Sequence, residues 1–326
     1  MNKKKIILVV SAFVLLFVVI IGGLQILEST VFNNETILEP EQEIIDTKTI
    51  EKDGIKYFPR QDITTMLLIG VDLTEKVESS GFYVNDGSAD VVALVIFDEK
   101  NEKVDIISFN RDSIVEIPRI GLTGEKTGTF MGQLALSHTY GSGLEDSCLN
   151  TLETVSNLLG GVEIDYYAAL NMGGIPALND AVGGVTVNVT DDFSEVDESI
   201  TKGEFLLKGE QALTFIRARK NLGDQLNISR SERHKEYVKG FLESYRTKTA
   251  TDSLFGKKLI EATDGYLVTN CSANTLMGFS ERYNNYELGE IVSPKGENVR
   301  GEEFYEFYID EEDLENIVLK YLYTLK

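Results

Sequence analysis

The feature that most constrains this chain is the apolar run at its start. Three lysines at positions 3–5 precede an almost uninterrupted apolar stretch, residues 6–26. A helix rises about 1.5 Å per residue, so this stretch spans roughly 30 Å, the thickness of a bilayer's hydrocarbon core. The lysines and Glu28 orient such a helix with its N-terminus in the cytoplasm. The sequence therefore predicts a cytoplasmic tail (residues 1–5), a single transmembrane helix (6–26) and an extracellular bulk.

A cleaved signal peptide is the alternative for the same segment. The apolar run is longer than the ~7–15 residues usual in signal peptides, and no small-residue cleavage motif follows it. We therefore favour a retained anchor. Residues 27–63 are rich in Glu and Asp with weak periodicity, which predicts an acidic spacer between the membrane and a folded domain.

A folded domain is expected over residues 64–250, where short β-branched runs alternate with helical patterns. Strands are expected at residues 66–71, 91–97, 104–109, 166–170 and 185–189. Helices are expected at residues 144–159, 172–182, 209–217 and 229–245. This order predicts an α/β or mixed α+β fold, with a central mixed β-sheet flanked by helices.

Two segments have weaker patterns. Residues 121–132, rich in Gly and Thr, are expected to form a loop. Residues 251–326 carry two more helical patterns and a hinge near residues 294–301. They are expected to form a C-terminal extension that packs on the domain or continues it.

The charge of the chain limits its partners. Its net charge is −22, and the three lysines of the tail lie on the cytoplasmic side, so the extracellular part is more negative still. Such a surface repels nucleic acid, so the charge argues against a DNA-binding role. An anionic substrate must therefore be held by a local group of cations or by a metal.

The residues that most often mark a reaction class are sparse. Two cysteines, Cys148 and Cys271, leave open either a disulfide, which an extracellular location allows, or two buried thiols. The chain has two histidines, too few for a His-based zinc site. It lacks GxSxG, GxxxxGK[ST] and HExxH motifs, so serine hydrolases, P-loop enzymes and zincins have no support.

Two carboxylates lie at predicted strand ends. Asp72 ends one strand and Asp90 begins the next, so antiparallel pairing would bring both to the same end of the sheet. Two hard oxygen ligands with open positions suit Mg²⁺ that carries substrate phosphates. Taken singly, each aspartate is more commonly a turn or cap residue.

Arginines form the most specific pattern. Arg111 follows a predicted strand and lies beside Asp112. Four more arginines lie within seventeen residues: Arg217, Arg219, Arg230 and Arg233. The last two share a face in the first turn of a helix, where cations oppose the helix dipole but a bound anion is favoured. The pattern predicts a phosphate or pyrophosphate clamp, and the alternative is a solvated basic face.

Seven segments, in this order, resemble the LytR–CpsA–Psr family of bacterial cell-envelope proteins. They are MLLIGVD (66–72), IISFNRD (106–112), HTYGSG (138–143), LLGGVEIDYY (158–167), NDAVGGVTV (179–187), LKGEQAL (207–213) and IRAR (216–219). The resemblance covers roughly residues 64–245. A short cytoplasmic tail and one membrane helix before an extracellular domain is also this family's usual layout.

The resemblance implies an enzyme that transfers a phosphate-linked glycopolymer, such as teichoic acid or capsular polysaccharide, from a polyprenyl-pyrophosphate carrier to peptidoglycan. It implies Mg²⁺ as the cofactor and an apolar lipid tunnel between the sheet and its helices. Matched by position, Asp72 and Asp90 hold the metal. The catalytic residues implied are Asp90, Arg111, Arg217 and Arg219. The pyrophosphate is gripped by Arg111, Arg217, Arg219, Arg230 and Arg233.

The sequence departs from the family's pattern at several positions. Many members carry Lys-Ile-Asn where this chain has Gln133-Leu-Ala135, and an arginine where it has Ser88. His234 and Lys235 stand where glutamines are common. These departures indicate a divergent branch of the family.

Two other functions are weighed against the transferase. One is a non-catalytic, membrane-anchored protein that binds polyprenyl phosphate or acts as a sensor. The other, a transcriptional attenuator, conflicts with the acidic charge and the extracellular topology. The expected location is the cell membrane of a Gram-positive-type bacterium, with a single pass, a cytoplasmic N-terminus and an extracellular bulk.

Overall fold

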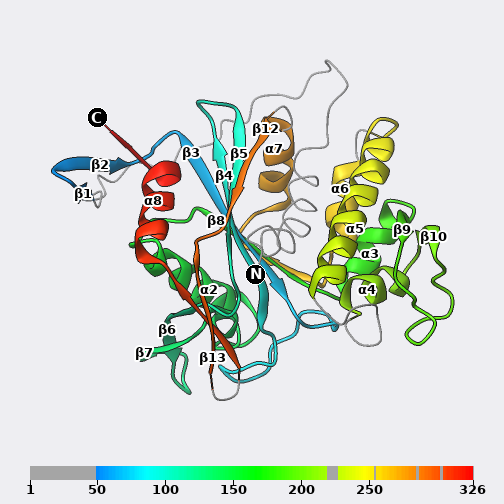
Figure 1. The fold of residues 1–326 in the computed structure, drawn as a ribbon, viewed down its shortest axis with the longest axis horizontal. Coiled ribbons are helices and arrows are strands. Elements are labelled where there is room, and N and C mark those ends of the chain that lie inside the picture. Colours follow the sequence, from blue (N-terminus) through cyan, green and yellow to red (C-terminus); the bar gives the residue numbers. More distant parts are fainter. Residues whose placement is uncertain (1–48, 219–226, 253–254, 284–285, 302–303, 326) are drawn as a thin grey trace.

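The computed structural model describes most of the chain after the first 48 residues (Figure 1). The described residues are 49–218, 227–252, 255–283, 286–301 and 304–325. Within these ranges no helix is long and apolar enough to cross a membrane. The predicted tail, the predicted transmembrane helix (6–26) and the spacer up to residue 48 lie outside the described residues.

A six-stranded mixed sheet forms the centre of the fold (Figure 1), which confirms the predicted fold class. Its strand order is β11-β8-β3-β4-β5-β12. β3 and β4 pair antiparallel, as do β4 and β5, whereas β8 runs parallel to β3 and β12 parallel to β5. The strands are β3 (Ile63–Val71), β4 (Ala89–Asp98), β5 (Lys103–Phe109), β8 (Tyr166–Asn171), β11 (Leu267–Thr269) and β12 (Glu287–Val292).

Helices bury both faces of this sheet because side chains alternate along each strand. On one face, Leu67 and Ile69 of β3 belong to a core that includes residues of α2 (Glu145–Leu158) and α8 (Glu311–Leu322). On the other face, Met66 and Leu68 pack with residues of α7 (Ala273–Tyr283). Strands buried on both sides require near-continuous apolar runs, which is how β3 and β4 read in the sequence.

A third apolar core lies beyond β8, on the right of Figure 1. It joins four helices to a two-stranded hairpin. The elements are α3 (Gly174–Ala181), α4 (Glu210–Arg217), α5 (Asn227–Thr249), α6 (Phe255–Ala262), β9 (Val185–Val189) and β10 (Gly203–Leu207). The expected helices at 172–182, 209–217 and 229–245 and the expected strand at 185–189 are all present here.

Besides the β9–β10 hairpin, the described residues form three more small sheets, and each of them corrects an expectation. β6 (Ile114–Ile120) pairs with β7 (Lys126–Gln133), after which a 3-10 turn (η1, Leu134–Ser137) follows, so most of the segment expected as a loop is a strand. The loop expectation failed because β7 is largely exposed and has no apolar alternation to mark it. The residues near the expected hinge form β13 (Gly296–Arg300), paired with β14 (Tyr305–Ile309).

The third small sheet corrects the length of the spacer. β1 (Ile50–Lys52) pairs with β2 (Ile55–Pro59), and β2 pairs with the C-terminal strand β15 (Tyr323–Leu325). Residues 50–59 are therefore part of the folded domain, and the predicted spacer to residue 63 is too long. The pairing partner lies at the far end of the chain, so no local pattern could mark it.

The C-terminal residues belong to the same fold as the rest of the domain. Both edge strands of the central sheet, β11 and β12, come from beyond residue 250, as do α6, α7 and α8. Each of the three apolar cores contains described residues from both before and after residue 250. The segment therefore continues the domain.

The two cysteines do not form a disulfide. Both are free and buried. Cys148, on α2, belongs to the core on one face of the sheet, whereas Cys271 belongs to the core on the opposite face. The sheet lies between the two thiols, and burial raises the pKa of Cys148 to about 12, so this thiol is inert at neutral pH. Of the two alternatives left open by the sequence, buried thiols hold.

A buried ion pair at one end of β4 gives the fold a pH dependence. Burial raises the pKa of Asp98, but the hydrogen bonds from Arg60 and Asn101 together lower it by more. The resulting pKa is about 2. Because the folded pKa lies below the unfolded value near 3.9, the stabilisation is present above about pH 4 and lost as the pH falls toward 2. We expect Asp98→Asn to cost about 2 kcal/mol more at pH 6 than at pH 2. Urea unfolding of both proteins across this range measures the difference, and a pH-independent difference would contradict it.

Candidate functional site

Asp72 and Asp90 lie at the same end of the central sheet, as the antiparallel pairing of β3 and β4 predicts. Asp72 directly follows β3, and its N–H donates to the carbonyl of Ser88 at 3.0 Å. The ladder between β3 and β4 shifts register beside Val71, which leaves Asp90 as the extra residue of a β-bulge. A bulge redirects the side chains near it, and it is a common device at the rim of a functional site.

Each of these carboxylates pairs with an arginine from another element. Arg217, the last residue of α4, donates from Nη2 to Oδ1 of Asp72 at 3.0 Å. Arg111, in the turn after β5, donates from Nη1 to Oδ1 of Asp90, whose side chain is only 5% exposed. Two arginines of the predicted clamp and both predicted metal carboxylates are therefore brought together at one end of the sheet.

The two ion pairs differ in how readily they can be exchanged for a ligand. The side chains of Arg217 and Asp72 are 43% and 35% exposed, and such a pair contributes under ~1 kcal/mol to stability. Arg111 is 36% exposed, but its partner Asp90 is buried. An incoming anion can therefore bind Arg217 at little cost, while Arg111 is held more firmly by its carboxylate.

The turn that carries Arg111 is braced by the C-terminal hairpin. Oδ1 of Asp112 lies 3.6 Å from Nε of Arg111. Gln133 donates from Nε2 to that same carboxylate at 3.3 Å and to the carbonyl of Tyr305 at 2.8 Å. The N–H of Phe307 donates to the carbonyl of Asp112 at 2.8 Å. The sequence did not indicate this support, because β14 and Arg111 lie far apart along the chain.

Arg233 is in the interior and its guanidinium already has protein partners. The residue is 4% exposed. Nε donates to the carbonyl of Phe215 at 3.0 Å, and the other nitrogens donate to the carbonyl of Ala218 and to Asp191. Its ring neighbour is Phe193, with the guanidinium 5.8 Å from the ring centroid. In this structure Arg233 holds the C-terminal end of α4, the helix end that carries Arg217.

The remaining two predicted clamp residues are described little or not at all. Arg219 lies outside the described residues. Arg230 lies in the first turn of α5, the helix that follows α4 in the chain. Their expected contacts with pyrophosphate stay predictions.

The long loop between Asp72 and Asp90 is anchored by one buried amide, Asn85. Its Nδ2 donates to the carbonyls of His138 at 2.9 Å and Gly141 at 3.0 Å, and to Oγ of Ser147 at 3.1 Å. Its Oδ1 accepts from the N–H of Gly87 at 2.6 Å. This amide therefore holds the loop against the segment 138–147. Two backbone carbonyls of the motif HTYGSG are its hydrogen-bond acceptors.

His138 supports the same loop from the other side. Its Nδ1 lies 3.0 Å from the carbonyl of Gly87, so the neutral ring donates a hydrogen bond there. Burial lowers the pKa of His138, which keeps it neutral at pH 7. Asn85 and His138 were not singled out from the sequence as site residues. For His138 the signal was the family motif HTYGSG, in which it is the first residue.

Taken together, the site can hold a phosphate-bearing anion next to carboxylates. Two guanidinium groups face one end of the sheet, and guanidinium binds phosphate in a planar, two-point geometry. The adjacent carboxylates can bind a divalent cation or accept a proton. Each of the two guanidinium groups is paired with a carboxylate, so a bound phosphate would share the arginine with that carboxylate or replace it.

The sequence model of the LytR_cpsA_psr family matches residues 27–320. The chain belongs to this family.

Similar proteins of known name support the family assignment. Bacillus subtilis TagV, named polyisoprenyl-teichoic acid–peptidoglycan teichoic acid transferase, is 29% identical over 212 residues, which are 63% of this chain and 50% of that protein. TagU of Bacillus licheniformis carries the same functional name and is 26% identical over 323 residues, 97% of this chain and 94% of that protein. The chain spans about half the length of TagV and of Enterococcus faecalis TagU.

Solved structures of family members share the fold. The crystal structure of B. subtilis TagV superposes with a TM-score of 0.57 at 24% identity, over 81% of this chain and 98% of that one. B. subtilis TagT superposes with a TM-score of 0.55 at 21% identity, over 80% of this chain and 91% of that one. At these identities the likeness shows a shared fold and nothing further.

Two departures from the family's pattern fall inside the site. Ser88 donates from Oγ to Oδ1 of Asp90 at 3.2 Å, so a neutral donor stands where many family members carry a cation. Gln133 contacts Asp112 and the C-terminal hairpin in place of a lysine. Both positions still contact the residues that hold the two ion pairs, but without charge of their own.

Proposed function

We propose that this protein transfers a phosphate-linked glycopolymer of the teichoic acid type from a polyprenyl-pyrophosphate carrier to peptidoglycan. The observation that carries the proposal is the meeting of Arg111 and Arg217 with Asp90 and Asp72 at one end of the sheet. The functional names of TagV and TagU, members of the same family, supply the substrate class. A capsular polysaccharide is the other polymer compatible with this site.

In the proposed reaction an acceptor hydroxyl forms a new bond to the phosphorus that carries the glycopolymer. The bond from that phosphorus to the bridging oxygen breaks, and polyprenyl monophosphate leaves with that oxygen. The carboxylate of Asp90, which is paired with Arg111, accepts the hydroxyl proton. Arg111 and Arg217 stabilise the charge that develops on the phosphate oxygens, together with Arg219 and Arg230 in the predicted clamp.

We assign Arg233 a positioning role in this proposal. Its guanidinium donates to two carbonyls at the end of α4 and to Asp191, and it is buried. It fixes the direction in which α4 presents Arg217 rather than touching the phosphates.

The residues fit Mg²⁺ as the cofactor. Asp72 and Asp90 are hard oxygen ligands at one end of the sheet, the type that Mg²⁺ prefers. Over the described ranges no group of three or more His, Cys, Asp and Glu side chains could hold a metal. Asp72 and Asp90 would therefore hold the ion together with phosphate oxygens and water. When bound, it neutralises charge on the transferred phosphate.

We also propose that residues 6–26 anchor the chain in the cell membrane with the domain outside. The lysines before the segment and the apolar composition of the segment support this arrangement. Enzyme and lipid-linked donor would then share one surface, which raises the donor's effective concentration at the site.

The decisive experiment uses the full-length chain in detergent with a polyprenyl-pyrophosphate-linked glycan and peptidoglycan fragments. We expect polyprenyl monophosphate to be released with Mg²⁺ and not with EDTA. Asp90→Asn should lower the rate by about 100-fold or more, because it removes the proton acceptor and a metal ligand. Asp53→Asn, in the exposed β1–β2 turn, is the matched control. Tight donor binding without product would instead support the non-catalytic alternative.

A further inference from the structure

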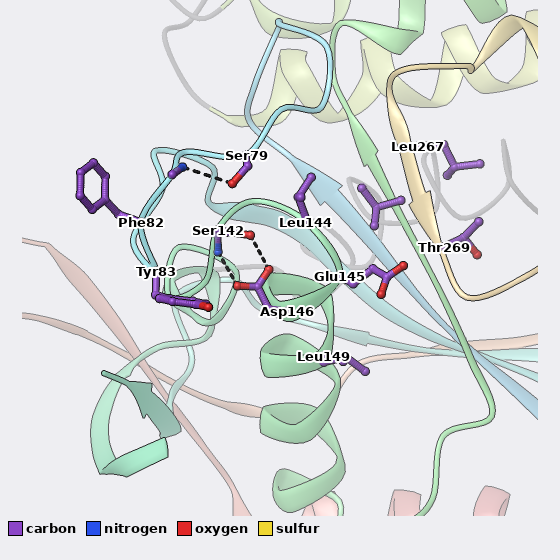
Figure 2. A pocket seen from close by; sticks show the side chains of 12 residues that line it. Ser79, Phe82, Tyr83, Ser142, Leu144, Glu145, Asp146, Leu149, Leu267 and Thr269 are labelled. Atoms are coloured by element: carbon purple, nitrogen blue, oxygen red, sulfur yellow. Dashed lines mark hydrogen bonds between the residues drawn. The ribbon is translucent and has the colours of Figure 1, made fainter. Parts of the chain in front are cut away.

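A cavity of about 750 Å³ lies beneath the loop that joins Asp72 to Asp90 (Figure 2). Its walls are loop residues 79–83, the start of α2 with the turn before it, and strand β11. The volume is within the range of ~300–1,000 Å³ usual for sites that bind small molecules or parts of larger ones. None of the clamp and metal residues that the structure describes lines this cavity.

One wall of the cavity belongs to the loop that joins Asp72 to Asp90 of the proposed catalytic site. Its loop wall begins seven residues after Asp72 and ends seven residues before Asp90. The N–H of Ser80 donates to the carbonyl of Ser142 at 2.8 Å, which joins the loop to the opposite wall. Asn85 holds the far end of the same loop through the hydrogen bonds of its side chain. The cavity is therefore built on a fixed loop and needs no rearrangement to form.

The cavity wall combines apolar surface with carboxylates. In Figure 2, the side chains of Glu145 and Leu149 extend from α2 toward the strand that carries Leu267 and Thr269. Leu149 is 51% exposed and gives the cavity wall an apolar surface. Asp146 accepts from the N–H and Oγ of Ser142, both at 2.7 Å, and so shapes the turn.

Glu145 is the carboxylate available to a ligand. Glu145 is exposed, and within the described parts of the chain its side chain makes no hydrogen bond or ion pair. An ionised carboxylate only accepts hydrogen bonds, so it favours ligands with O–H or N–H groups. It repels phosphate, because two like charges at short range are unfavourable.

The cavity and the proposed catalytic site, which share the loop between Asp72 and Asp90, therefore have opposite charge preferences. Arg111 and Arg217 favour the phosphates of the donor, whereas Glu145 and Asp146 disfavour them. A transferase needs a second site for the acceptor, and an acceptor glycan offers hydroxyl and amide donors on an apolar ring face. We propose that this cavity binds an uncharged segment of the acceptor glycan, with its hydroxyl or amide groups donating to Glu145 and its ring packed on Leu149.

This inference rests on the proposed function, and it adds a site that selects the acceptor. Glu145→Gln keeps the shape but weakens the acceptor of hydrogen bonds, and Leu149→Ala removes the apolar contact. Glu243→Gln on α5 and Leu122→Ala, a residue that is 95% exposed, are matched controls on other surfaces.

The experiment uses the full-length chain in detergent. It measures how much of the donor's glycopolymer is transferred to acceptor glycan and how much is released by hydrolysis. We expect Glu145→Gln and Leu149→Ala each to raise the KM for acceptor glycan and to lower the ratio of transfer to hydrolysis, by about tenfold. Binding of an N-acetylglucosamine tetramer, followed by calorimetry, should weaken in parallel. The controls should change each quantity by less than about twofold.

Several outcomes would overturn the inference and leave the proposed function intact. One is an unchanged acceptor KM in both variants while Arg217→Ala still abolishes turnover. Another is a raised KM for the donor alone, which would make the cavity a lipid or polymer site. A third is loss of binding to a peptide from the peptidoglycan stem but not to the sugar tetramer. If wild type releases no Mg²⁺-dependent product, the proposed function fails, and tetramer binding still decides whether the cavity holds glycan.

Discussion

Arg217→Ala is expected to lower the turnover of the lipid-linked donor by about 100- to 1,000-fold. Removal of one preorganised donor to a developing oxyanion typically costs this much. Its stability effect should be small, because Arg217 and Asp72 are both substantially exposed and such pairs contribute under ~1 kcal/mol. Steady-state release of polyprenyl monophosphate by the full-length chain measures the first quantity, and urea unfolding measures the second.

A matched arginine shows whether the effect is specific. Arg282 on α7 is 61% exposed and donates to Glu99 at 2.9 Å, so Arg282→Ala removes a similar surface pair elsewhere. We expect it to leave turnover within about twofold of wild type. Arg217→Lys keeps the charge but loses the two-point geometry, and an intermediate rate is expected. If Arg217→Ala loses less than about tenfold, Arg217 does not stabilise the transferred phosphate.

Arg233→Ala is expected to destabilise the protein by about 3–5 kcal/mol. The change leaves Asp191, whose side chain is 12% exposed, without its cation, and it removes donors from two carbonyls at the end of α4. For a domain of this size each kcal/mol shifts Tm by ~2–4 °C, so the expected decrease is roughly 6–20 °C. Thermal unfolding followed by circular dichroism measures it.

The companion variant separates the charge from the shape. Asp191→Asn in the Arg233→Ala background should recover part of the loss, because no buried charge then remains unpaired. Arg282→Ala is again the surface control. A loss below about 1 kcal/mol in Arg233→Ala would show that this arginine is not structural, and would return it to the predicted phosphate clamp.

Much of the fold could be read from local pattern. The runs that became β3, β4 and β5 are apolar throughout because both faces of the sheet are covered, and the short connection between β4 and β5 favours antiparallel pairing of these two strands. The same pairing predicts that Asp72 and Asp90 lie at one end of the sheet, which the fold confirms. The exposed strand β7 and the hairpin β1–β2 were missed, since exposed strands carry no apolar alternation.

The candidate site was predictable in its residue types and less so in their roles. Arg111 and Arg217 were named from the sequence, and both contact the predicted carboxylates. The spacing of Arg230 and Arg233 indicated a shared helix face, but it could not say that Arg233 points into the interior. Helical periodicity gives a direction relative to the helix, and only neighbouring elements decide whether that direction is solvent or core.

The sequence by itself determined the class of the domain, its family and the chemical type of its site. These depend on composition, periodicity and the order of short motifs, all of which are local. The tertiary structure alone decided that Arg217 reaches Asp72 across 145 residues, that both edge strands come from the C-terminal part, and that the two thiols lie on opposite faces of the sheet. Such contacts join segments far apart in the chain, so their free energy has no signature in any short stretch of it.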